Sequence, residues 1–171
     1  MKKKFIIKIL FTLCMVSAFI YADAQVKSSS FNFTLKLLLS GSTPTINIPE
    51  AAAGFRSYTF LDARELNEYN VSHLQTALFA GAKTFSLDKV KNIKKNQLLI
   101  VYCSIGKRSE EVTLKLKKAG YTDVKNLYGG IFEWVNQGNR VYNNRNVITD
   151  SVHAYSHFWG KWLDKGVKVY D

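Results

Sequence analysis

Residues 98–102 form an unbroken apolar run, Leu-Leu-Ile-Val-Tyr, that stops abruptly at Cys103. A continuous run of this length is typical of a central strand in a parallel sheet that is covered on both faces. Residues 109–119 predict a helix, because acidic side chains lie near its N-terminus, lysines lie near its C-terminus and Gly120 follows as a stop. This order places Cys103 beyond the carboxyl end of a strand, where α/β sheets bind their ligands.

The rest of the chain alternates short apolar strands with helical segments. Predicted strands cover residues 45–48, 57–61, 77–79, 98–102 and 124–127. Predicted helices cover residues 33–39, 50–53, 65–69 and 109–119, and a last one runs from Gly130 to near Gly138. Strands that alternate with helices predict a parallel α/β sheet.

The N-terminus has the pattern of a secretory signal peptide. Three lysines precede an apolar stretch at residues 5–21, and Ala22-Asp23-Ala24 follows as a small-x-small cleavage site. A retained membrane anchor is the alternative, but Lys8 leaves about a dozen uninterrupted apolar positions where roughly 20 are needed. We therefore expect cleavage after Ala24 and export to the periplasm or the medium, without stable membrane association. An uncleaved leader would anchor the protein.

Removal of the leader changes the thiol count and the charge. Cys14 lies inside the leader, so the mature chain keeps a single thiol, Cys103, in a compartment where thiols usually form disulfides. Loss of four lysines and one aspartate lowers the formal net charge from +11 to +8. We attribute this positive charge to a solvated lysine-rich exterior that keeps the protein soluble, in preference to specific attraction of anions. The lysines are dispersed and no binding motif is evident, so we expect no nucleic-acid partner.

The segment from Cys103 to Ser109, Cys-Ser-Ile-Gly-Lys-Arg-Ser, joins the buried strand to the helix. A loop that curls around the sulfur aims backbone N–H groups at it, and the helix N-terminus adds partial positive charge. Gly106 permits the tight curl, and Lys107 and Arg108 add two cations that favour a thiolate and attract an anion. The same cradle suits a persulfide and needs no metal or cofactor. The alternative is that Cys103 is only a small buried apolar residue.

This loop resembles the active-site loop of rhodanese-like sulfurtransferases, Cys-x-x-Gly-x-Arg-Ser. Residues 61–69 resemble the acidic-Arg segment of that family, residues 71–77 its Gly-His-Ile-Pro-Gly-Ala stretch, and residues 128–134 its late Gly-Gly…Trp motif. The resemblance covers residues 45–138. Two departures, Ser72 in place of Gly and Gln75-Thr76 in place of Pro-Gly, predict a turn that is built differently.

The resemblance implies a rhodanese-like fold with about five strands in a mostly parallel sheet and helices on both faces. It implies that Cys103 takes a sulfane sulfur from a small anionic donor such as thiosulfate and passes it to cyanide or a thiol, with no cofactor. One alternative is a persulfide relay or protein-binding module with little thiosulfate turnover, whose partner is a sulfur-relay protein. A distant alternative is a phosphatase or arsenate reductase, but those relatives carry one more residue between cysteine and arginine.

Each candidate residue has an expected role. Cys103 is the nucleophile, and the active-site loop consists of Ser104, Ile105, Gly106, Lys107, Arg108 and Ser109. By resemblance, Arg108 braces the loop and Lys107 meets thiosulfate. Ser109 is expected to cap the helix, with a hydrogen bond to the sulfur as the alternative. Asp62 and Arg64 are expected to form a supporting ion pair.

The last segment of the chain is unusually aromatic. It contains Tyr142, Tyr155, Phe158, Trp159, Trp162 and Tyr170. His153 and His157 are predicted to share a helix face, but no third ligand accompanies them, so no metal site is expected. We divide the chain into a signal peptide (1–24), an N-terminal lead-in (25–44), a rhodanese-like domain (45–138) and a C-terminal extension (139–171) that packs on the domain.

Overall fold

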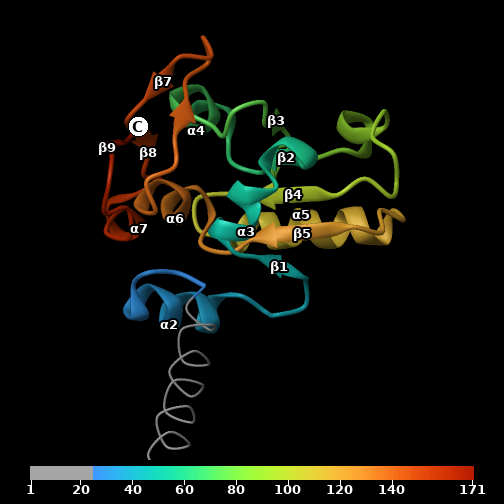
Figure 1. Ribbon diagram of the computed structural model, residues 1–171, viewed down its shortest axis with the longest axis horizontal. Coiled ribbons are helices and arrows are strands. Elements are labelled where there is room, and N and C mark those ends of the chain that lie inside the picture. The colour runs from blue at the N-terminus through green and yellow to red at the C-terminus, as the bar shows by residue number, and fades with distance from the viewer. Residues whose placement is uncertain (1–24) are drawn as a thin grey trace, which may run out of the picture.

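The computed structural model describes residues 25–171 (Figure 1). The predicted signal peptide, residues 1–24, therefore lies outside the described part of the chain, and so does Cys14. None of the helices within residues 25–171 has the length and apolar character needed to cross a membrane.

A five-stranded sheet forms the centre of the molecule, with the strand order β1-β5-β4-β2-β3 (Figure 1). Its strands are β1 (Thr45–Ile46), β2 (Thr59–Asp62), β3 (Leu78–Phe79), β4 (Leu99–Tyr102) and β5 (Val124–Leu127). Every neighbouring pair in this sheet is parallel, and Leu61 of β2 lies opposite Val101 of β4. The predicted parallel α/β sheet is confirmed.

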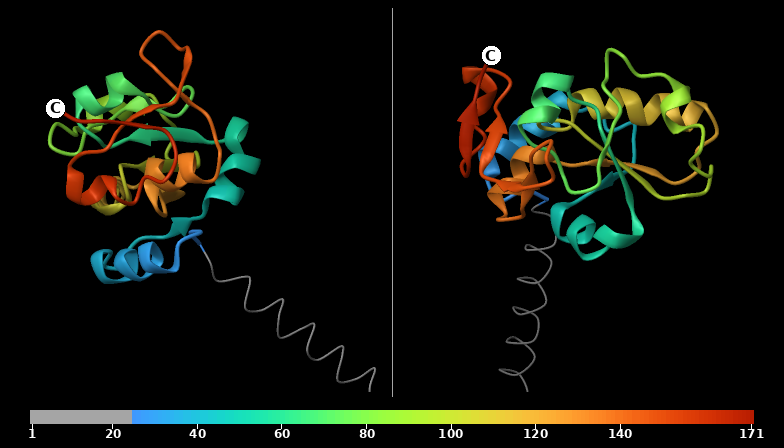
Figure 2. Two further views of the ribbon diagram at one scale, coloured as in Figure 1. Left: turned by 90° about the vertical axis from the view of Figure 1, so that its left-hand side faces the viewer. Right: turned by 90° about the horizontal axis from the view of Figure 1, so that it is seen from above.

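Helices cover both faces of the sheet, as predicted (Figures 1 and 2). They are α2 (Ser29–Leu38), α3 (Ile48–Ala53), α4 (Leu66–Val71), α5 (Lys107–Lys118) and α6 (Gly130–Asn136), with short 3-10 helices η1 (Phe55–Ser57) and η2 (Leu87–Val90). Side chains of β4 alternate between two cores: Ile100 and Tyr102 join α2, α3 and α6, whereas Leu99 and Val101 join α5. Burial on both faces explains why this strand is apolar throughout.

The helix ends follow local side-chain chemistry. Asn47 caps α3 by accepting a hydrogen bond from the Glu50 amide at 2.8 Å, so the helix begins at Ile48, earlier than predicted. Helix α5 begins at Lys107, two residues before the predicted start. Gly106 has a φ of 117°, which a glycine adopts at little cost, and the chain turns from the loop directly into the helix.

The C-terminal extension contains an antiparallel pair, β6 (Val141–Tyr142) with β7 (Ile148–Thr149), a parallel pair, β8 (Ser151–His153) with β9 (Val167–Val169), and α7 (His157–Gly160). The prediction that His153 and His157 share a helix face is wrong, because His153 lies in β8 and only His157 lies in α7. Trp162 stacks on Phe31 of α2 with ring centroids 5.1 Å apart. The extension therefore lies beside α2 on one side of the molecule (Figure 2).

Candidate active site

Cys103 directly follows β4, at the carboxyl edge of the sheet, and its side chain is 1% exposed. The loop behind it curls back, so that the Gly106 amide donates a hydrogen bond to the Cys103 sulfur at 3.2 Å. Within residues 25–171 this is the single cysteine, and it is a free thiol. The loop thus surrounds the sulfur with main-chain donors at the start of α5.

The surroundings of Cys103 favour its thiolate form. Burial alone would raise the pKa of the thiol, but the Arg108 charge, the Ser109 hydroxyl and the amides of Ser109 and Gly106 outweigh it, so the pKa is lowered. The Ser109 hydroxyl has one proton and donates it to Asn126 Oδ1 at 2.7 Å. Because this proton is hydrogen-bonded to Asn126, the charge of Arg108 and the two amides are the main groups that stabilise the thiolate.

Arg108 is turned toward α4, away from the opening of the loop. Its guanidinium donates to both carboxylate oxygens of the buried Glu68, at 2.5 and 2.8 Å, and to Ser104 Oγ at 2.9 Å. Ser104 in turn donates to Glu68 at 3.2 Å. These contacts tie both ends of the active-site loop to one carboxylate.

The buried Asn126 of β5 holds the middle of the loop. Its side-chain amide donates to the Gly106 carbonyl at 2.9 Å, while its Oδ1 accepts from Ser109. The prediction that Ser109 caps α5 is wrong: the residue before this helix is Gly106, and Ser109 lies inside the first turn. Its hydroxyl instead donates a hydrogen bond to Asn126 and so links α5 to β5.

Helix α6 supports the loop from the other side. The Ile131 amide donates to the Cys103 carbonyl at 2.9 Å, and the Phe132 amide donates to the Ser104 carbonyl at 3.1 Å. This close approach requires Gly130, which has a φ of 59° and whose Cβ, if present, would lie 2.3 Å from the Cys103 carbonyl oxygen. Gly130 therefore allows the loop to pack directly against α6.

Asp62 and Arg64 form a fully buried ion pair, with Arg64 Nη2 2.6 Å from Asp62 Oδ2. Arg64 also donates to the Ser72 carbonyl at 2.5 Å, so the pair fixes the turn after α4. In that turn Thr76 adopts a φ of 60°, a conformation that a non-glycine residue seldom takes. The predicted ion pair is therefore present, its hydrogen bonds reach the Ser72 carbonyl, and neither residue lines the pocket.

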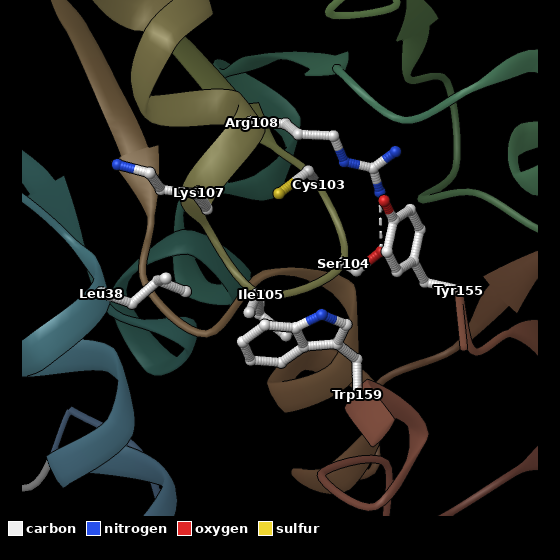
Figure 3. A pocket seen from close by; sticks show the side chains of 8 residues that line it. All are labelled: Leu38, Cys103, Ser104, Ile105, Lys107, Arg108, Tyr155 and Trp159. Atoms are coloured by element: carbon white, nitrogen blue, oxygen red, sulfur yellow. Dashed lines mark hydrogen bonds between the residues drawn. The ribbon is translucent and has the colours of Figure 1, made fainter. Parts of the chain in front are cut away.

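The thiol lies at a pocket of about 140 Å³ lined by Leu38, Cys103, Ser104, Ile105, Lys107, Arg108, Tyr155 and Trp159 (Figure 3). The Lys107 side chain is 43% exposed, and its ammonium lies 3.4 Å from Glu110 Oε2. Gly106 and Ser109 support the loop and are not part of the lining. The structure thus brings the sequence-predicted loop residues together around one sulfur.

Five residues of this site were not predicted from the sequence to be functional: Leu38, Glu68, Asn126, Tyr155 and Trp159. Asn126 had a weak local indication, because an amide between Val124 and Leu127 of a short central strand needs a partner if it is buried. Glu68 lies in one of the matching motifs, but nothing in the sequence joins it to Arg108. The three pocket residues come from the two ends of the chain, and no sequence spacing places them over Cys103.

Within residues 25–171, no three metal-ligating side chains are gathered into a group that could hold a metal ion. The chemistry that the described residues themselves can perform is nucleophilic attack by a stabilised thiolate. The loop amides and Arg108 can stabilise the negative charge before and after the attack.

The family model of the rhodanese-like domain matches residues 49–137. A Bacillus subtilis (strain 168) protein, uncharacterized protein YqhL, is 32% identical over 95 residues, which are 53% of this chain and 71% of that protein. The probable adenylyltransferase/sulfurtransferase MoeZ of Mycobacterium tuberculosis is 30% identical over 83 residues, which are 48% of this chain and 21% of MoeZ.

Solved structures show the same fold. A rhodanese-related protein from Thermoplasma volcanium matches with a TM-score of 0.52 and 25% identity, over 57% of this chain and 96% of that one. A thiosulfate sulfurtransferase from Pseudomonas aeruginosa matches with a TM-score of 0.56 and 20% identity, over 78% of this chain and 26% of that one. The second likeness concerns the fold alone.

Proposed function

The chain belongs to the rhodanese-like domain family, and we propose on this basis that it is a sulfurtransferase that carries a sulfane sulfur on Cys103. The observation that supports this most strongly is the loop itself. The sulfur accepts a hydrogen bond from the Gly106 amide, and this bond and the positive charge of Arg108 both lower the pKa of the thiol.

The proposed reaction has two steps. The Cys103 thiolate attacks the terminal sulfur of thiosulfate or a similar anionic donor, a new S–S bond forms, and sulfite leaves with the electron pair of the broken S–S bond. Cyanide or a thiolate then attacks the outer sulfur of the persulfide, and Cys103 leaves as a thiolate. The anionic persulfide occupies the same cradle of amides and cation as the thiolate.

The loop length supports sulfur chemistry over phosphate chemistry. Four residues separate Cys103 from Arg108. The loop therefore closes around a single atom, since the Gly106 amide already reaches the sulfur at 3.2 Å. A tetrahedral group needs a wider ring of donors.

The test is thiocyanate formation from thiosulfate and cyanide by residues 25–171. We expect turnover by the wild type and none by Cys103→Ser, with Ser42→Ala, an exposed change outside the site, as the matched control. Persulfide on Cys103 without turnover would favour a relay that hands sulfur to another protein. Phosphate release from an aryl phosphate that is lost in Cys103→Ser would contradict the proposal.

We further propose that the protein acts outside the cytoplasm after cleavage behind Ala24. The support is the sequence of residues 1–24, in which lysines, an apolar stretch and Ala-Asp-Ala follow one another. The mass of the full-length product recovered from the exported fraction tests this. A chain that starts at Gln25 is expected, and an intact leader in the membrane fraction would contradict it.

A further inference from the structure

Both ends of the chain contribute to the wall of the pocket over Cys103. Leu38 is the last residue of α2, and Tyr155 and Trp159 belong to the C-terminal extension. All three lie outside residues 49–137, which match the family model. The stacking of Phe31 on Trp162 holds the two ends together beside the pocket. This wall is therefore an addition to the shared domain.

The added wall is apolar, whereas Lys107 and Arg108 bring positive charge to the rest of the pocket lining. In Figure 3 the Trp159 indole lies beside Ile105, across the pocket from Cys103 and Arg108, and Leu38 lies on the same side as the indole. No acidic or basic side chain lines that side. The cations of the other side already have partners, Glu68 for Arg108 and Glu110 for Lys107. A ligand therefore gains most binding free energy by covering the apolar wall with apolar surface of its own.

The size of the pocket limits what fits. Its volume of about 140 Å³ is close to that of an apolar protein cavity of roughly 150 Å³ that holds benzene. One six-membered ring or a short branched alkyl group therefore fits beside the sulfur. A longer body would extend past the rim, where Tyr155 is 51% exposed.

Tyr155 is held in position by its backbone. Its φ of 65° is an uncommon value for a bulky residue, and such conformations cluster at ligand sites. The amide of Tyr155 donates to Nδ1 of the buried His153 at 3.1 Å. Its ring lies over the Arg108 guanidinium, with 4.9 Å between the Cζ atom and the ring centroid. The half-exposed ring adds little to the core and forms the edge of the pocket.

We propose that Trp159, Leu38 and Tyr155 make this site selective for sulfur donors whose leaving group carries an apolar body of about one ring. This inference rests on the proposed function. For an organic thiosulfonate, the Cys103 thiolate attacks the terminal sulfur and an S–S bond forms. The bond between that sulfur and the sulfonyl group breaks, and a sulfinate leaves with its electron pair.

Two probes with the same reacting group test the selectivity: benzenethiosulfonate and methanethiosulfonate, each with cyanide as acceptor. The measured quantity is the ratio of their kcat/KM values. We expect Trp159→Ala to lower this ratio about tenfold, the effect of losing one aromatic contact. Leu38→Ala, at the other end of the chain, should lower it about threefold.

Each variant has an exposed apolar residue of the same part of the chain as its control. Val167 of the extension is 60% exposed and Leu37 is 73% exposed, and neither lines the pocket. Val167→Ala and Leu37→Ala should therefore keep the wild-type ratio. A ratio that is the same in the wild type and in both wall variants would overturn the selectivity and leave the sulfurtransferase intact.

A binding measurement separates this inference from the proposed function. Benzenesulfonate and methanesulfonate have no sulfane sulfur, so they occupy the pocket without reacting. We expect benzenesulfonate to slow the alkylation of Cys103 at a concentration where methanesulfonate does not, and Trp159→Ala to remove the difference. Equal protection by both would overturn the inference. Protection without thiocyanate or persulfide from any donor would overturn the proposed function alone.

Discussion

Arg108 Nη1 lies 2.5 Å from Glu68 Oε2, and a second hydrogen bond joins the same two side chains. The arginine that follows the reactive cysteine is thereby fixed by a carboxylate of α4. Its charge stays close enough to lower the pKa of Cys103 while its donors are directed at Glu68 and Ser104. The pair connects the site to a helix that precedes it in the chain.

Replacing the buried carboxylate should weaken the fold. Glu68→Gln removes a charged acceptor from Arg108, and we expect the free energy of unfolding to fall by about 2–3 kcal/mol. Urea unfolding measures this. Lys83→Ala breaks an exposed pair with Glu65 at 3.9 Å and should cost less than about 0.5 kcal/mol. Equal losses in the two variants would show that the Glu68 pair contributes no more than a surface pair.

The Glu68 carboxylate also makes the stability of the fold depend on pH in the acidic range. Burial would raise the pKa of Glu68, but its hydrogen bonds and the charge of Arg108 outweigh this and lower it. A lowered pKa contributes stability above the unfolded value of about 4.3, and that stability is lost as pH falls through the folded pKa. Urea midpoints measured from about pH 6 to pH 3 should fall less steeply in Glu68→Gln than in the wild type. Parallel curves would contradict this.

Asn126 should matter more than its neighbours on β5. Asn126→Leu keeps the volume but leaves the Gly106 carbonyl and the Ser109 hydroxyl without their partner, which costs about 1–3 kcal/mol. Lys125→Ala on the same strand removes a partly exposed contact to Glu50 and should change the stability by less than about 0.5 kcal/mol. Chemical denaturation of both variants provides the comparison. A tolerated Asn126→Leu would refute the role of this side chain in holding the loop.

Alanine substitutions at two glycines distinguish the cost of backbone strain from the cost of a steric clash with the active-site loop. Gly130 and Gly120 both have positive φ, but a Cβ at Gly130 would lie 2.3 Å from the Cys103 carbonyl oxygen, whereas nothing lies within 4 Å at Gly120. Gly120→Ala should cost about 1 kcal/mol from strain alone. Gly130→Ala should cost more and should lower the rate of sulfur transfer at least about tenfold, because a 1 Å displacement of reacting groups has larger effects still. Equal rates in the two variants would contradict this.

Local sequence patterns predicted the elements that carry the site. The apolar run at residues 98–102 corresponds to β4, and the charge pattern of residues 109–119 corresponds to α5. These predictions succeeded because both elements are determined by burial and by end charges within a few residues. The start of α5 was misplaced, because the positive φ of Gly106 replaces the side-chain cap that Ser109 was expected to supply.

Long-range contacts could not be predicted in the same way. Glu68 and Asn126 reach the loop across 40 and 20 residues, through hydrogen bonds that depend on how the strands are ordered. Tyr155 and Trp159 line the pocket of Cys103 because the extension packs back on the domain, through the stacking of Trp162 on Phe31 and hydrogen bonds with Asn136 of α6. The density of aromatic residues in the extension indicated packing, but not its location.

The central claim is that the loop holds Cys103 as a thiolate that is ready to accept sulfur. Its most direct test is the rate of alkylation of Cys103 by iodoacetamide as a function of pH, followed by intact mass on the folded protein. Only the thiolate reacts, so the rate rises as pH passes through the pKa. We predict half of the maximal rate at a pH below the value of about 8.5 for free cysteine. A midpoint at or above that value, or a folded protein that resists modification, would contradict the account.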